Sequence, residues 1–234
     1  MDEKMTKLSK RKYSIDLIII FLTSMAVLLI YGIVIQIVKF DTGDMPILTQ
    51  TFIGALLEYG IMGLGITIVC ILRKENFRSF GLKKDKLLIT IALSALVCLP
   101  ELINTAVKGE LHSYLPFQGV NFTKSILASG FPINIIGMII IAVSWGFFEG
   151  FSYAVISDRI NKRFSSKNFW LNWGAIVCGI FCILIHGAVG LAPGAIIDAL
   201  CTFILIYGML VVYDYTGNAW GCVFIYFVYW NAIA

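Results

Sequence analysis

The sequence places acidic and imidazole side chains inside stretches that are otherwise strongly apolar. These residues are Glu58, Glu101, Glu149, His186 and Asp198, and no lysine or arginine lies at a comparable depth. An ionised side chain at the centre of a membrane helix costs about 2.5–3.5 kcal/mol, so each one needs protonation, a polar partner, water or a metal. A carboxylate whose pKa suits the operating pH can act as a general base, which makes these positions the candidates for chemistry.

Glu149 is the acid for which a helix contact is most strongly indicated. It follows Gly146 and precedes Gly150, and the Gly-x-x-x-Gly spacing lets the backbone of another membrane helix approach closely. We therefore expect its carboxyl group to meet a partner. In contrast, Glu58, Glu101 and Asp198 lie within two turns of the expected external ends of their apolar runs, where water or lipid head groups can solvate them.

Cys178, Cys182 and His186 form a stripe at spacings of four residues on one predicted helix. Thiolate and imidazole are ligands for zinc, so a divalent metal held by Glu149, His186 and Cys182 is one hypothesis. The alternative is that the cysteines are small apolar packing residues. The sequence offers no evident fourth ligand and no motif for any other cofactor.

The composition is that of a membrane protein. The chain has 234 residues, of which 59% are hydrophobic and only 14% charged, with a mean hydropathy of +0.88, and no ordinary water-soluble domain reaches such values. We expect one transmembrane domain over residues 1–234, with membrane lipid as its main surrounding. The net charge of +4 follows the expected membrane topology, so no nucleic acid partner is predicted.

Apolar runs long enough to cross about 30 Å of hydrocarbon as helices recur along the chain. They cover approximately 14–38, 52–72, 87–107, 133–156, 170–192, 194–213 and, as the shortest, 219–234. The sequence therefore predicts an all-α polytopic bundle of about seven transmembrane helices.

The basic residues predict the orientation. Most of the 18 lysines and arginines lie in residues 1–13, between the second and third runs, and after the fourth run. Segments rich in lysine and arginine stay on the cytoplasmic side. We expect a plasma-membrane protein with a cytoplasmic basic N-terminus, residues 1–13, and an external C-terminus.

The order of these polar residues resembles that of a known family. Glu149 on one run, His186 on the next, and Thr-Gly-Asn-Ala-Trp at 216–220 leading to Asn231 resemble the CPBP family, which groups CAAX-prenyl endoproteases with bacteriocin-processing and immunity-type membrane proteins. The resemblance covers roughly residues 75–234. The segment 77–84 is also similar to a short Gly-Leu loop that often precedes the family's core.

The first family motif, Glu-Glu-x-x-x-Arg, is only partly present. If Glu149 is the first glutamate, Gly150 and Ala154 replace the second glutamate and the arginine; if it is the second, Phe148 and Tyr153 occupy the other two places. Only one carboxylate is retained in either alignment.

The later motifs also differ from the family pattern. In Phe-x-x-x-His, His186 is present, but Cys182 stands where phenylalanine is expected. In His-x-x-x-Asn, Asn231 is present, while Tyr226 or Phe227 replaces the histidine, depending on the alignment.

The resemblance implies an intramembrane endopeptidase that cleaves a membrane-associated peptide or membrane protein. Glu149 would activate water, and His186 and Asn231 would stabilise the oxyanion. Tyr153 and Tyr226 are supporting candidates, and the phenolic hydroxyl of Tyr226 or Tyr229 could replace the missing donor. The competing expectation for a tyrosine near the end of a span is that it anchors the helix at the lipid interface.

Two other functions fit the same residues. A catalytically inactive relative that binds a peptide, lipid or partner protein would explain the replaced arginine and histidine. A proton- or cation-coupled carrier would use Glu58, Glu101, Glu149 and Asp198 as a relay, although no internal repeat supports it. Convergence of Glu149, His186 and Asn231 would favour the enzyme.

Overall fold

Helices make up the regular secondary structure in the described part of the chain, where no strand is formed. The computed structural model describes residues 2–38, 45–111, 113–185, 193–230 and 232. The all-α prediction is confirmed for these residues, because apolar runs of this length satisfy their backbone hydrogen bonds internally as helices.

The elements follow one another in this order. The first half contains α1 (Asp2–Val38), α2 (Ile47–Glu58), a π-helical turn (Tyr59–Gly63), α3 (Leu64–Arg73), a 3-10 turn (Phe77–Phe80), α4 (Leu87–Val97) and α5 (Leu99–Val107). The second half contains α6 (Thr123–Ala128), α7 (Ile133–Ile141), a second π-helical segment (Ala142–Phe148), α8 (Glu149–Arg163), α9 (Trp173–Ile185), α10 (Pro193–Thr216), α11 (Trp220–Ile225) and a third π-helical segment (Tyr226–Trp230).

Five helices in the described residues are long and apolar enough to cross a membrane. They cover Leu8–Val34, Ile47–Arg73, Leu87–Val107, Ile133–Arg163 and Pro193–Thr216. The apolar helices Trp173–Ile185 and Trp220–Trp230 are shorter. The structure therefore agrees with a membrane protein of several spans, whereas the predicted number of seven is not confirmed.

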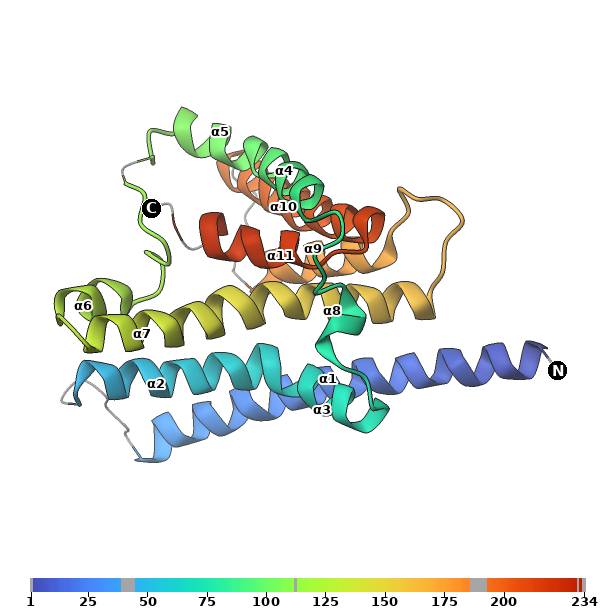
Figure 1. Ribbon diagram of the computed structural model, residues 1–234, viewed down its shortest axis with the longest axis horizontal. Helices are drawn as coiled ribbons and strands as arrows, with labels where there is room; N and C mark the ends of the chain where they lie inside the picture. The colour runs from blue at the N-terminus through green and yellow to red at the C-terminus, as the bar shows by residue number, and fades with distance from the viewer. Residues whose placement is uncertain (1, 39–44, 112, 186–192, 231, 233–234) are drawn as a thin grey trace.

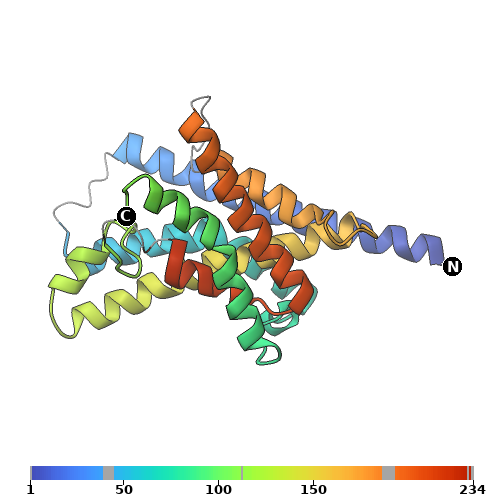
Figure 2. The same ribbon diagram turned by 90° about the horizontal axis from the view of Figure 1, so that it is seen from above.

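Helix α8 lies at the centre of the arrangement. It packs against α1 on one side and against α9 and α11 on the other, while α4 and α5 pack against α10. In Figure 1, α1, the α2–α3 pair and the α7–α8 pair run along the long axis, and α4, α10 and α11 cross above them. Figure 2 shows the oblique course of α10 over α9 from a second direction.

Two helices continue further than the apolar runs predicted. Helix α1 includes the basic segment before residue 14, and α8 continues beyond residue 156 to Arg163. Lysine, arginine and methionine are good helix formers, and Lys162 pairs with Asp158 one turn away at 2.8 Å. Polar residues therefore extend the helices past the limits set by hydrophobicity.

A buried ionic network joins α1, α3 and α8. The side chains of Asp16 and Arg159 are 0% and 1% exposed, and Arg159 Nε lies 3.2 Å from Asp16 Oδ2. Arg73 Nε donates a 2.7 Å hydrogen bond to Asp16 Oδ1, and Arg159 also pairs with Glu75. The guanidinium of Arg159 lies 4.8 Å from the ring centre of Phe80. Arg159 follows the fourth apolar run of the sequence, and in the structure it is a buried residue of α8.

Glu75 lies just beyond the end of α3, between two cationic groups. Partial burial by itself raises the pKa of its carboxyl group, but the hydrogen bonds and charges of Arg159 and Lys12 outweigh this effect. The pKa of Glu75 is therefore held below its usual value of 4.5. Its ionised form stabilises the folded protein.

Candidate functional site around Glu149

Glu149 begins α8 directly after the π-helical segment Ala142–Phe148, and only 6% of its surface is exposed. A π-helical segment inserts an extra residue into a helix and is frequent at functional sites. This segment packs against the first π-helical turn, with the rings of Tyr59 and Phe148 4.8 Å apart. The bulge thus lies where two membrane helices meet, immediately before the candidate base.

The close helix approach predicted from the glycine spacing is confirmed, and the partner is α11 with the segment that follows it. A Cβ atom on Gly150 would lie 2.7 Å from the carbonyl oxygen of Cys222 and 3.0 Å from Cα of Val223. A Cβ atom on Gly146 would lie 2.5 Å from the ring of Phe227. Only glycine at these positions permits this packing.

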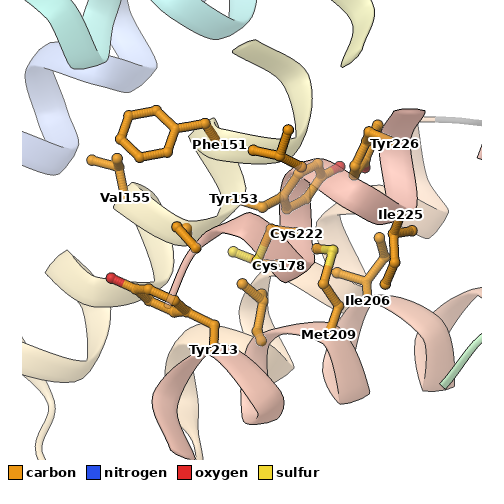
Figure 3. Packing of buried hydrophobic residues seen from close by; sticks show 14 of the residues in the cluster. Phe151, Tyr153, Val155, Cys178, Ile206, Met209, Tyr213, Cys222, Ile225 and Tyr226 are labelled. Atoms are coloured by element: carbon orange, nitrogen blue, oxygen red, sulfur yellow. The ribbon is translucent and has the colours of Figure 1, made fainter. Parts of the chain in front are cut away.

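Tyr153 and Tyr226 meet beside this contact. Tyr153 is one turn after Glu149 and 6% exposed, whereas Tyr226 is fully buried. Their rings are stacked, with centroids 5.7 Å apart and an angle of 21° between the planes. Figure 3 shows both side chains in the core among residues of α8, α9, α10 and α11. Because Tyr226 is fully buried in the core, the expectation of an interfacial anchor is wrong for Tyr226.

The hydroxyl of Tyr226 is buried beside that of Tyr153, and it makes no hydrogen bond of standard geometry among the residues that the structure describes. It is nonetheless close enough to Tyr153, Glu149 and Cys182 for their charges to affect it. A buried hydroxyl without a partner is unfavourable by about 1–3 kcal/mol. It is a donor that remains available for a ligand or a developing oxyanion.

The third π-helical segment presents the two candidates for the missing histidine in different directions. Tyr226 stacks on Tyr153, whereas Phe227 packs against Phe117 with ring centroids 5.4 Å apart, behind Gly146. Of the two, Tyr226 is therefore the residue on the same side as Tyr153. His186 and Asn231 lie outside the described residues, so their predicted convergence with Glu149 stays a prediction.

The cysteines of α9 belong to the core. Cys178 is 3% exposed and Cys182 is fully buried. Cys182 lies near Tyr153 and Glu149, and Figure 3 shows Cys178 beside Cys222. Within the described ranges, no group of three or more histidine, cysteine or acidic side chains could hold a metal ion. The metal hypothesis depends on His186 and stays a prediction.

Two of the remaining acids lie at one end of α5 and α10. Asp198 accepts a 2.8 Å hydrogen bond from Asn104 Nδ2 and pairs with Lys108. The hydrogen bond to Asp198 raises the pKa of the Lys108 ammonium. Oε2 of Glu101 is buried, without a hydrogen-bond partner among the described residues. The charge of Asp198 is thus balanced by a lysine.

A contact between two loops was not predicted, although both segments carry the family resemblance. The backbone N–H of Ala219 donates a 2.9 Å hydrogen bond to the carbonyl of Gly81. Asn218 Nδ2 donates to the carbonyls of Lys83 at 2.9 Å and Asp85 at 2.6 Å. The glycine on each side, Gly81 and Gly217, has a positive φ. The glycines and Asn218 were visible as turn signals, but their partner was not.

The comparisons with known proteins found no match to this chain. No protein-family model matches the sequence, no curated protein matches it as a relative, and no solved structure matches its fold.

Proposed function

We propose that this chain is an integral membrane endopeptidase with a CPBP-like core, in which Glu149 is the general base. The observation that carries the proposal is the placement of a buried glutamate beside a buried tyrosine hydroxyl at one helix contact. Glu149 and Tyr226 are 6% and 0% exposed, and in the described part of the chain the Tyr226 hydroxyl makes no hydrogen bond of standard geometry, with the Tyr153 hydroxyl as its polar neighbour. A base and an oxyanion donor are the two groups that amide hydrolysis needs.

The proposed reaction uses water and a peptide bond. The Glu149 carboxylate takes a proton from water, whose oxygen attacks the amide carbonyl carbon. The tetrahedral oxyanion accepts a hydrogen bond from the Tyr226 hydroxyl, and the resemblance adds His186 and Asn231 as further donors. Collapse breaks the C–N bond, and Glu149 passes its proton to the leaving amine. A single donor of this kind contributes about 2.7–4 kcal/mol to catalysis in well-studied hydrolases.

The topology proposed for this enzyme has seven crossings. The two shorter helices, Trp173–Ile185 and Trp220–Trp230, provide the crossings beyond the five longer ones. The positive-inside rule supports a cytoplasmic N-terminus, an external C-terminus and insertion in the plasma membrane. The substrate is a membrane-associated peptide or membrane protein, since lipid surrounds the site.

The tight packing around Glu149 favours a second candidate function. Tyr153 is buried close to Glu149, and the backbone of α11 lies against Gly150. A site this closed has to open before it can admit a peptide and water. A catalytically inactive membrane protein that binds a peptide, lipid or partner, like immunity-type relatives, needs no such opening.

Cleavage by the purified protein in lipid vesicles, measured on a library of membrane peptides that includes CAAX-like sequences, tests the proposal. We expect cleavage by the wild-type protein and its loss in Glu149→Gln and His186→Ala. Glu101→Gln is the matched control, because it makes the same change in another helix, and it should retain activity. No cleavage by folded wild-type protein, together with specific peptide retention, would instead support the binding function.

A further inference from the structure

A polar pocket lies at the opposite end of α8 from Glu149. It forms where the last turns of α8 and α10 meet the segment from Ser79 to Gly81, and its volume is about 490 Å³. Pockets of about 300–1,000 Å³ are typical of small-molecule sites. Its polar lining includes Ser79, Asp158, Lys162, Ser165 and Asp214.

The charges in this pocket are not balanced. Asp158 Oδ2 lies 2.8 Å from Lys162 Nζ and 3.4 Å from Arg159 Nη1, so its charge is compensated. Asp214 is exposed and has no cationic partner within ion-pair distance among the residues that the structure describes. The pocket is thus lined by one uncompensated carboxylate and by Lys162, whose side chain is 45% exposed and paired with Asp158.

Neighbouring aromatic residues place the pocket at the level of lipid head groups. Tyr215 follows Asp214 and is 63% exposed, and Trp170 is 69% exposed. The ring of Phe169 lies between them, with centroids 5.4 Å from Trp170 and 6.4 Å from Tyr215. Exposed tryptophan and tyrosine at the end of a membrane helix mark the water–lipid interface. Asp214 is also near the last residue of the apolar helix Pro193–Thr216.

We propose that this pocket binds the ethanolamine phosphate head group of an aminophospholipid. The ammonium group donates hydrogen bonds to the carboxylate of Asp214, and the phosphate accepts them from the hydroxyl of Ser165 and from Lys162, whose ammonium has N–H donors besides the one that Asp158 accepts. A primary ammonium has three N–H donors, whereas a choline group has none. Asp214 therefore selects ethanolamine over choline. This proposal does not depend on peptidase activity.

Retention of lipids with identical acyl chains, measured by native mass spectrometry of the purified protein, tests the proposal. We expect phosphatidylethanolamine to be retained about tenfold better than phosphatidylcholine, the gain of one charge-assisted hydrogen bond. Mono- and dimethylated head groups should fall between the two. This series needs no variant, so folding defects cannot produce the result. Equal retention across the series would overturn the proposal.

Variants then locate the site. Asp214→Asn should reduce retention of phosphatidylethanolamine to that of phosphatidylcholine, and Lys162→Gln should weaken retention of both. Asp85→Asn is the matched control, since Asp85 is 67% exposed, pairs with Lys83 and does not line the pocket; it should change nothing. The assignment would be contradicted if the Asp214→Asn variant still preferred phosphatidylethanolamine to phosphatidylcholine. It would also be contradicted if a lysine-containing soluble peptide were the only ligand that displaces the lipid.

Discussion

Asp16 on α1 and Arg159 on α8 form an ion pair that is closed to solvent on both sides, with 3.2 Å between Oδ2 and Nε. Arg73 also pairs with Asp16, and Glu75 and Asp158 pair with Arg159 at the less buried edge of the network, where Lys12 pairs with Glu75. Burying one charge without its partner is far more unfavourable than burying a balanced set. The network therefore fixes how α1 sits against α3 and α8.

Asp16→Asn should destabilise the fold strongly. The substitution keeps the shape of the side chain but removes the acid that Arg73 and Arg159 share, so that Arg73 has no ion-pair partner among the described residues and Arg159 keeps only Glu75 and Asp158. We expect a loss of about 3–5 kcal/mol in the free energy of unfolding. Denaturant titration in detergent micelles measures it. Asp85→Asn breaks the exposed pair between Lys83 and Asp85, 3.8 Å apart, and should cost less than about 1 kcal/mol. Equal losses in the free energy of unfolding would show that the buried network stabilises the protein no more than an exposed ion pair does.

The position of Glu75 predicts that the protein loses stability at acidic pH. Its pKa in the folded state is below the usual 4.5, so its contribution is present above pH 4.5 and is lost as the pH falls through the folded-state value. The free energy of unfolding, measured from about pH 6 downward, should decrease below about pH 4.5. Glu75→Gln should be less stable at neutral pH and lose part of this decrease. An unchanged pH profile in the variant would show that other carboxylates cause the loss of stability at acidic pH.

Residues 157–163 show why sequence predicted the helices better than their ends. Hydrophobicity marks where lipid begins, but a helix continues for as long as its polar side chains find partners. Arg159 has partners from α1 and from the segment after α3, and such long-range pairing cannot be inferred from local composition. The π-helical segments at Tyr59–Gly63 and Ala142–Phe148 were missed for a similar reason. They pack against each other, so each depends on a neighbour distant in sequence.

Gly150→Ala should weaken the contact between α8 and α11. The added Cβ would lie 2.7 Å from a backbone oxygen, at Cys222, and backbone cannot move aside as a side chain can. We expect a loss of about 1–3 kcal/mol, the usual cost of overpacking, in the same unfolding assay. Gly32→Ala is the matched control, because nothing lies within 4 Å of its added Cβ. That variant should be neutral or gain up to about 1 kcal/mol from higher helix propensity.

Asn218→Ala should release the loop that precedes α4. It removes the donors to the carbonyls of Lys83 and Asp85 and the acceptor for the backbone N–H of Trp220 at 2.9 Å. Each buried group left unpaired is unfavourable by about 1–3 kcal/mol. Limited proteolysis should then cut between residues 74 and 86 faster than in the wild type, while Asn76→Ala, at the exposed start of the same loop, should have a smaller effect. Equal cleavage of all three proteins would show that Asn218 does not hold the loop.

The candidate site could be predicted only in part. The Gly-x-x-x-Gly spacing around Glu149 correctly indicated a close helix contact, because close packing of helix backbones requires small residues at a fixed spacing. The identity of the partner helix, α11, and the stacking of Tyr153 on Tyr226 come from the tertiary arrangement. Aromatic residues near the ends of apolar runs occur both in cores and at interfaces, so their type alone could not place these two tyrosines.

Tyr226→Phe separates a catalytic hydroxyl from a structural ring. The phenylalanine ring can keep the stacking on Tyr153, whose centroid lies 5.7 Å away, and the change removes a buried hydroxyl that makes no hydrogen bond of standard geometry in the described residues. Folding stability should therefore stay unchanged or increase slightly. If the hydroxyl stabilises an oxyanion, kcat should fall about 10²–10³-fold with little change in KM. Tyr229→Phe, a change to another tyrosine of the same segment, should leave kcat unaffected. A stable Tyr226→Phe variant with full activity would remove Tyr226 from the mechanism and leave Glu149 to work with other donors.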